Sequence, residues 1–198
     1  MLGLPADFYQ REVLLVAREL LGKRLVRTWQ GQRIAGRICE TEAYDGEQDL
    51  ACHAKSGRTT RNAVMYSPGG HGYVYFTYGM HWCFNVVTGS AGYPAAVLIR
   101  AIWPLEGLPA IAEVRGKFPQ PLWCDGPAKL CQALRIDGSL NGVDLCASSE
   151  LWIEEGKPVP DALVRTTPRI GIQSVPEPWL SKPWRFLTAF KNEDLING

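Results

Sequence analysis

Segments with the composition of β-strands follow one another along this chain without the regularly alternating helices of a parallel α/β sheet. They are rich in Val, Ile, Tyr and Phe and are separated by Gly- and Pro-containing turns. We expect strands at Arg24–Trp29, Arg33–Tyr44, His71–Tyr78, His81–Thr88, Ala95–Trp103, Leu151–Glu154, Arg169–Ile172 and Trp184–Phe190. This order predicts an α+β fold with a largely antiparallel, curved sheet and flanking helices.

Helical periodicity is confined to two segments. Asp7 and Gln10 have the spacing of a capping box, and apolar residues then recur at helical spacing as far as Leu21. Pro127 suits the first turn of a second helix that continues through Leu134. Because no repeat and no long linker interrupts the chain, the sequence predicts one domain.

Composition excludes several classes of protein. Of the 198 residues, 46% are apolar and 21% charged, which excludes a disordered or fibrous chain, so we expect the single domain to span residues 1–198. No apolar run approaches the roughly 18 residues of a membrane span, and no signal peptide is visible, so no membrane partner is expected. The six cysteines lack metal-ligand spacing, and we expect free thiols, no metal and no cofactor.

Charge is distributed unevenly although the net charge is only +1, which argues weakly against a nucleic-acid binder. The segment 37–50 is acidic, and the segment that follows it is basic, with Lys55, Arg58 and Arg61. These three cations are candidates for phosphate contacts, together with Lys129, Lys182 and Arg185, although each is equally explained as a surface charge.

Two carboxylates and one arginine are the candidates for chemistry. Side-chain alternation in a strand puts Ile38, Glu40, Glu42 and Tyr44 on one face, so the two glutamates form either a general base with a helper or a solvated strand end. Arg100 has apolar neighbours on both sides, and a buried guanidinium needs a carboxylate such as one of these two.

Polar and aromatic residues in the neighbouring strands have two interpretations. Asn85, within an apolar strand, is either a satisfied core amide or a group that contacts a ligand. The aromatic run from Tyr73 to Met80 is either a core strand or a platform on which planar rings stack. His53 is by itself more typical of a structural role.

Three sequence blocks together resemble one family. They are Glu40-Thr41-Glu42-Ala43-Tyr44, Tyr73-Val74-Tyr75-Phe76-Thr77-Tyr78-Gly79-Met80 and Gly126-Pro127-Ala128-Lys129-Leu130-Cys131-Gln132-Ala133-Leu134, with His53 between the first two. With these blocks the chain is similar to the 3-methyladenine DNA glycosylases of the alkyladenine (MPG) family, over about residues 14 to 190.

The resemblance implies a monomeric, monofunctional enzyme that hydrolyses the N-glycosidic bond of damaged purines in double-stranded DNA, without a lyase step. The implied substrates are 3-methyladenine, 7-methylguanine, hypoxanthine and ethenoadenine. The implied location is the cytoplasm and nucleoid of a bacterium or the nucleus of a eukaryote. The implied fold carries a protruding β-hairpin that enters the DNA.

The resemblance also implies residue roles. Matching positions make Glu42 the general base and Arg100 the residue that helps hold the attacking water. The remaining positions match residues that enclose the flipped base (Tyr44, His53 and Tyr75), crowd normal guanine (Asn85), enter the minor groove (Tyr78), lie beside the duplex (Met80) and belong to a DNA-contacting block (Lys129). The basic loop after His53 is one residue shorter than in the family, and His81 stands where Tyr is expected, which leaves DNA contacts and substrate preference open.

Two other functions stay open at this point. Paired carboxylates also occur in carbohydrate hydrolases, although Glu40 and Glu42 share a strand face too closely to clasp a sugar from two sides. Aromatic residues beside a basic loop are also typical of a non-catalytic binder of single-stranded nucleic acid, but that function leaves Glu42 and Arg100 unexplained.

Overall fold

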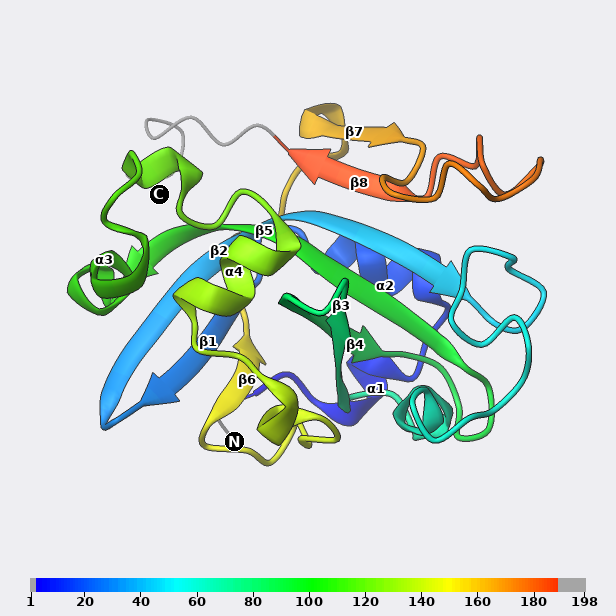
Figure 1. Ribbon diagram of the computed structural model, residues 1–198, viewed down its shortest axis with the longest axis horizontal. Coiled ribbons are helices and arrows are strands. Elements are labelled where there is room, and N and C mark those ends of the chain that lie inside the picture. The colour runs from blue at the N-terminus through cyan, green and yellow to red at the C-terminus, as the bar shows by residue number, and fades with distance from the viewer. Residues whose placement is uncertain (1–2, 189–198) are drawn as a thin grey trace.

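The computed structural model describes residues 3–188, in which strands dominate the regular structure (Figure 1). The helices are α1 (Ala6–Tyr9), α2 (Val13–Glu19), α3 (Leu108–Arg115) and α4 (Pro127–Ala133). The strands are β1 (Arg24–Trp29), β2 (Gln32–Asp45), β3 (Gly72–Thr77), β4 (His81–Val87), β5 (Ala95–Glu106), β6 (Leu151–Glu154), β7 (Val164–Thr167) and β8 (Arg185–Thr188).

All of these strands join one antiparallel sheet. Its main path runs β3-β4-β5-β2-β1-β6, and β7 and β8 attach to it through β2. The long strand β2 pairs with β5 along one edge, while its other edge pairs first with β1 and then with β8. The predicted α+β fold with a curved antiparallel sheet is thereby confirmed.

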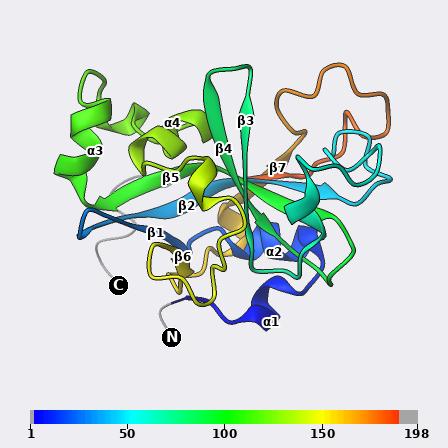
Figure 2. The same ribbon diagram turned by 60° about the horizontal axis from the view of Figure 1, so that its bottom comes forward.

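The sheet lies between helices on its two sides. Figures 1 and 2 show α2 on one side of β2 and β5 and α4 on the other. On the α2 side, the Thr41 hydroxyl donates to the backbone oxygen of Ala17 at 2.8 Å. Side chains alternate along β2, so the neighbouring Glu42 points to the opposite side of the sheet, where the site described below is found.

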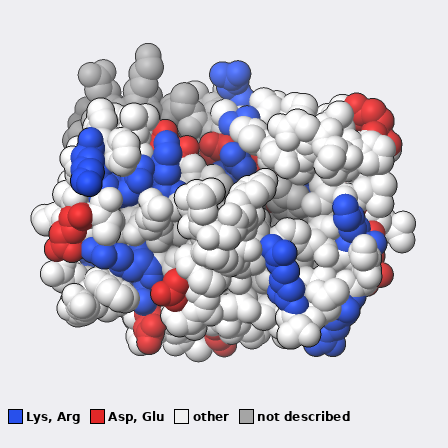
Figure 3. Space-filling view, in the orientation of Figure 1, with Lys and Arg blue, Asp and Glu red and all other residues white. Residues whose placement is uncertain are grey.

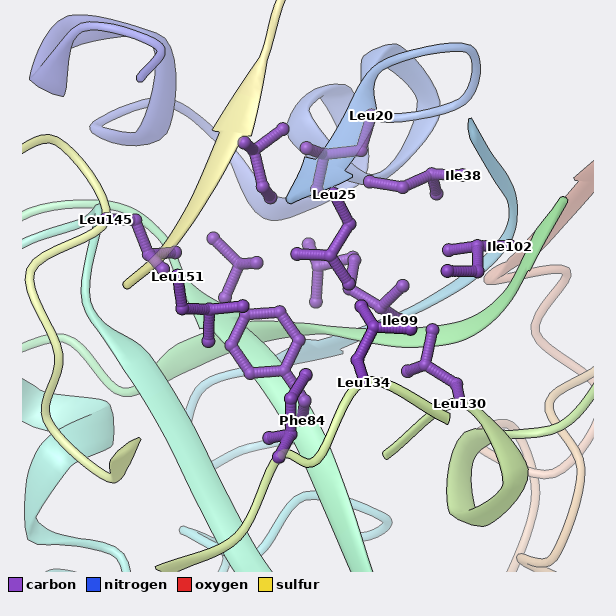
Figure 4. Close-up of a cluster of buried hydrophobic side chains, with 14 of the residues drawn as sticks. Leu20, Leu25, Ile38, Phe84, Ile99, Ile102, Leu130, Leu134, Leu145 and Leu151 are labelled. Atoms are coloured by element: carbon purple, nitrogen blue, oxygen red, sulfur yellow. The ribbon is translucent and has the colours of Figure 1, made fainter. Parts of the chain in front are cut away.

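The main core packs around Phe84, which is fully buried together with Leu25, Ile99 and Leu134 (Figure 4). Each such side chain contributes about 1.5–3 kcal/mol through burial alone. A smaller cluster, which includes Met65 and Tyr73, packs separately around the site. The site is therefore built on rigid strands with an apolar layer behind them.

Irregular pairing between β2 and β5 changes one predicted face. Cys39 on β2 and Arg100 on β5 are extra residues at the register shifts between these strands. Because of the shift at Cys39, Ile38 packs in the main core with Ala43 instead of sharing a face with Glu42. The prediction for Ile38 is therefore wrong, and bulges of this kind have no clear sequence signal.

Two other sequence predictions are wrong, and part of a third is not tested. Residues Arg169–Ile172 form no strand, since Arg169 and Ile170 bond to side chains and backbone around β2 instead of a ladder partner. Asp7 lies inside α1 and caps no helix. Residues 189 and 190 of the predicted last strand lie outside the described residues.

The hairpin of β3 and β4 projects from the body of the molecule (Figure 2). Its turn contains Tyr78 and Gly79, both with positive φ (51° and 65°), and the Met80 N–H donates to the Thr77 oxygen at 3.1 Å. Positive φ at both central positions is the requirement of a type I′ turn. The protruding hairpin predicted above is present.

No helix between residues 3 and 188 has the length and apolar composition that crossing a bilayer requires.

Candidate active site

A pocket of about 310 Å³ opens on the side of the sheet opposite α2. Side chains from β2, β3, β4 and β5 form its floor and walls, and the loop at residues 170–172 closes one side. Six of the residues singled out from the sequence line it, namely Tyr44, His53, Tyr75, Tyr78, Asn85 and Arg100. Residues far apart in the sequence are thus brought to one cavity.

Glu42 does not itself line the pocket: its side chain is completely buried and contacts three residues that do. Its Oε1 accepts the backbone N–H of Ile170 at 2.7 Å, and its Oε2 accepts the Tyr44 hydroxyl at 2.9 Å. The Arg100 guanidinium lies 3.3 Å from Oε2. Burial raises the pKa of Glu42 above its ordinary value, although Arg100 and the two donors oppose the shift.

Arg100 bridges the two glutamates of the strand, which confirms the expected pairing with a carboxylate. Its Nε lies 2.6 Å from Glu40 Oε1, and its other nitrogen approaches Glu42. Glu40 also accepts from Arg185 at 2.6 Å, so two guanidinium groups neutralise this carboxylate. Glu42 contacts one guanidinium only, and this difference in compensation distinguishes two residues that strand spacing could not separate.

The aromatic residues enclose the pocket at angles to one another. The rings of His53 and Tyr75 lie 4.4 Å apart at 71°, and Tyr73 lies 5.4 Å from Tyr75. His53 Nδ1 lies 2.9 Å from the Tyr73 hydroxyl. Although His53 is exposed at the rim, desolvation of its ring and the charges of Arg61 and Lys55 lower its pKa to about 4. The imidazole is therefore neutral at pH 7.

Asn85 is buried in the pocket wall, and its side-chain amide forms a hydrogen bond to the backbone. Its Nδ2 donates to the Tyr73 oxygen at 3.1 Å. The side chain lines the pocket beside Leu98 and Cys83, which the sequence did not single out. Both interpretations of Asn85 are thus compatible with its position, since it is hydrogen-bonded and it also faces the cavity.

Tyr78 and Met80 are exposed at the tip of the β3–β4 hairpin, by 82% and 66% respectively. A left-handed backbone costs a residue other than glycine roughly 1–2 kcal/mol. An exposed Tyr side chain recovers none of that cost by packing. Such an arrangement is typical of a residue kept for contact with another molecule.

Basic residues surround the pocket without forming a single patch. Lys55, Arg58 and Arg61 are exposed on the loop before β3, and Arg61 donates to the Phe76 oxygen of the hairpin at 3.1 Å. Lys129, on α4, pairs with Asp125 at 2.8 Å. On the face shown in Figure 3, Lys and Arg side chains lie on both sides of the central uncharged surface.

Ile170, which donates to Glu42, and the ion pair of Arg169 with Asp49 beside Tyr44 were missed from the sequence. Arg169 is buried, forms a two-bond ion pair with Asp49, and lies 4.7 Å from the centre of the Tyr44 ring. Ile170 supplies the N–H that Glu42 accepts. Asp49 stands in the acidic segment 37–50, and no local pattern there distinguishes a buried carboxylate from an exposed one. Among residues 3–188, no group of three or more His, Cys, Asp or Glu side chains converges to hold a metal.

Comparison with known proteins now identifies the family. The family described as methylpurine-DNA glycosylase (MPG) matches residues 7–192. The chain belongs to the methylpurine-DNA glycosylase family. The match covers all of the pocket residues and the β3–β4 hairpin, so this is a DNA glycosylase, as the sequence resemblance implied.

Relatives of this glycosylase in several organisms carry a provisional name, 3-methyladenine DNA glycosylase. One from Methanocella arvoryzae is 52% identical over 184 residues, which is 92% of this chain and 90% of the relative. One from Carboxydothermus hydrogenoformans is 52% identical over 86% of this chain and 89% of the relative. One from Myxococcus xanthus is 49% identical over 92% and 88% respectively. Similarity at this level extends over nearly the whole molecule, so it includes the fold and the site together.

Proposed function

We propose that this glycosylase hydrolyses the N-glycosidic bond of alkylated or deaminated purines in double-stranded DNA, with Glu42 as the general base. The observation that carries the proposal is a fully buried carboxylate, held by Arg100 and an amide N–H, beneath a cavity walled by aromatic rings. The substrates we expect are 3-methyladenine, 7-methylguanine, hypoxanthine and ethenoadenine, because the relatives' name and the matching residues both point to damaged purines.

Glu42 has the environment that a general base needs. A raised pKa brings a carboxylate closer to the working pH, which favours proton transfer from water. Ionised Glu42 takes a proton from a water directed at the anomeric carbon, and Arg100 helps to hold that water. The same negative charge stabilises the oxocarbenium character that develops on the sugar as the base leaves.

The pocket walls suit a planar, electron-poor base. A purine inside a duplex is out of reach, so it must be rotated out at a cost of a few kcal/mol, which is least for a damaged base. Tyr44, His53 and Tyr75 then contact the flipped ring, and a cationic alkylated purine is further attracted by aromatic faces. Asn85 crowds the 2-amino group of normal guanine. N3- and N7-alkylated purines already carry positive charge and leave without an acid.

The exposed hairpin tip suits the vacated place in the DNA stack. Tyr78 is the wedge and Met80 lies beside it, in the way that apolar side chains enter a minor groove elsewhere. The exposed cations Lys55, Arg58 and Arg61, with Lys129, contact phosphates. We propose a monofunctional enzyme, since no lysine lines the pocket in the described residues to attack the sugar. We also propose a monomer, as the family resemblance implies.

One duplex with a single hypoxanthine tests the proposal against its alternatives. The wild-type protein should convert the site to an abasic site, detected as strand cleavage by hot alkali and not before it. A matched duplex with adenine at that position is the control. Binding without excision, unchanged in Glu42→Gln, would instead support a non-catalytic binder. Cleavage before alkali treatment would contradict the monofunctional chemistry.

A further inference from the structure

Arg169 has no role in the proposed chemistry, but it contacts several residues that lie next to Glu42. Its side chain is completely buried and forms two bonds to Asp49, at 2.5 and 2.9 Å. It also donates to the backbone oxygen of Ala43, the residue between Glu42 and Tyr44. Arg169 is therefore bonded to the strand that carries the proposed base, although it lines no part of the pocket itself.

The planar guanidinium of Arg169 contacts two aromatic rings. Its central carbon is 4.7 Å from the centre of the Tyr44 ring and 5.0 Å from that of Trp184. A planar fork can stack on rings and form a two-bond ion pair at the same time, which an ammonium group cannot do. These contacts fix the plane of Tyr44 and hence the direction in which its hydroxyl donates.

Two of the groups that contact Glu42 depend on this arrangement. The hydroxyl of Tyr44 donates to Oε2, and the ring that carries it rests on Arg169. The N–H of Ile170 donates to Oε1, and Ile170 directly follows Arg169 in the chain. The loop that contains Ile170 has no ladder partner, so it is attached to β2 through the Ile170 N–H itself and through the side chain of Arg169, which donates to Ala43.

We propose that Arg169, fixed by Asp49 and Trp184, is the positioning residue for Glu42. It keeps the Tyr44 hydroxyl and the Ile170 N–H on the two oxygens of the carboxylate, and so keeps that carboxylate both ionised and aimed. This inference rests on the proposed function, in which the ionised carboxylate activates water. It adds that the base is maintained by a buried ion pair outside the pocket.

The expected direction of the effect follows from the groups around Glu42. They are Arg100 on β5, Tyr44 and Glu40 on β2, Tyr75 on β3, Cys83 on β4, Arg185 on β8, which reaches Glu40, and the loop N–H of Ile170. Burial and Glu40 favour the protonated form, whereas Arg100, Tyr44 and the Ile170 N–H favour the ionised form. Losing the last two donors raises the pKa of Glu42 further.

Arg169→Lys tests the proposal because it retains the positive charge and removes the planar geometry. Single-turnover excision of hypoxanthine is measured against pH, with enzyme in excess over the duplex. The acidic limb of the profile should move upward by about one pH unit, so that the rate on this limb falls about tenfold at a given pH. Affinity for the lesion duplex should change by less than about twofold, because Arg169 itself does not line the pocket and the substitution leaves the Tyr44 ring in place.

Arg33→Lys is the matched control. Arg33 also forms a two-bond ion pair, with Glu154 at 2.9 and 2.7 Å, and also lies over an aromatic ring, that of Trp152. None of these residues lines the pocket. This variant should lose stability without moving the pH profile. An identical profile for wild type and Arg169→Lys, or equal shifts in both Lys variants, would overturn the proposal.

Two further measurements keep the result unambiguous. The Glu42 carboxyl carbon can be titrated directly by NMR, and its midpoint should rise in Arg169→Lys even without turnover. If that variant does not fold, Trp184→Leu removes one of the two stacked rings and should shift the profile in the same direction by a smaller amount. An inactive wild type would refute the proposed function itself, whereas an active wild type with an unmoved Glu42 titration would refute only the positioning role.

Discussion

Glu42 and Asp49 are two fully buried carboxylates in the same part of the chain, but they are compensated differently. Asp49 faces Arg169 through both oxygens and also accepts the backbone N–H of Ala51 at 3.0 Å. Glu42 has one guanidinium at 3.3 Å, one amide and one phenol. The first carboxylate has a full set of strong partners inside the protein, whereas the second lies beside a cavity.

Under the proposed function, this difference separates a structural ion pair from the proposed general base. A buried charge costs several kcal/mol unless its pairing is good, and the cost for Asp49 is offset by a bidentate partner. Burial raises the pKa of Glu42 in spite of its partners, so its ionised form is held in an unfavourable place. A perturbed pKa and a cost in folding stability of this kind are typical of catalytic groups.

The largest expected effect is that of Glu42→Gln on excision. The amide keeps the volume and an acceptor for the Ile170 N–H but cannot take a proton, so excision of hypoxanthine should fall by about 10²–10⁴-fold. The free energy of unfolding should stay equal or rise by about 0.5–2 kcal/mol, because the incompletely compensated burial of a charge is relieved. Single-turnover kinetics and urea denaturation on the same preparation measure both. Near-normal excision would refute the base assignment.

Asp49→Asn should have the opposite consequence for stability. It leaves Arg169 buried without its charged partner, and breaking such a pair costs about 3–5 kcal/mol. The pair of Arg18 with Asp161 has a contact of the same length, 2.5 Å, but the Asp161 side chain is almost fully exposed. Asp161→Asn is therefore the control, and its urea midpoint should barely move. Equal midpoints for the two Asn variants would remove the distinction between the two kinds of carboxylate.

Much of the sheet could be predicted because its strands have strong local signals. Arg24–Trp29 and Leu151–Glu154 match β1 and β6 to the residue, and the short turn at Gly31 fixes the first hairpin. The strand from Ala95 continues to Glu106, beyond the predicted end at Trp103, because pairing with β2 overrides the poor strand propensity of Pro104.

The candidate site was only partly visible in the sequence. Arg100 could be found because a charged residue inside an apolar strand requires a partner. Side-chain alternation gave Glu40 and Glu42 as that partner, and only the family resemblance singled out Glu42. Arg169 and Asp49 could not be found, because their ion pair joins two loops that are distant in sequence and no periodicity marks either residue. Tertiary contacts of this kind decide which of several charged residues is buried.

Tyr44→Phe examines one of the contacts that Glu42 has and Asp49 lacks. The ring, and therefore stacking with Arg169, is retained, while the phenol donor to Oε2 is lost. A hydrogen bond to a charged group is worth about 1.5–3 kcal/mol, so excision should fall about tenfold or somewhat more. Tyr93→Phe is the matched control, because its hydroxyl donates to Asp45 at 2.9 Å outside the pocket. An unchanged rate in Tyr44→Phe would mean that this contact does not tune Glu42.

The smallest expected effect is the pH dependence of stability. The folded pKa of Glu42 is raised above 4.5, so between the two values the folded protein binds more protons than the unfolded chain. The contribution of Glu42 to the unfolding free energy therefore falls as pH rises through that window. Glu42→Gln lacks this loss, so its melting temperature relative to wild type should increase with pH from about 4.5 upward. Glu154→Gln should change in the opposite direction. Hydrogen bonds from Arg33 lower the pKa of Glu154, so the melting temperature of this variant should fall further below that of wild type as pH rises toward 4.5. Thermal unfolding at constant ionic strength measures both differences. If the melting temperatures of wild type and Glu42→Gln changed in parallel with pH, folding would not raise the pKa of Glu42.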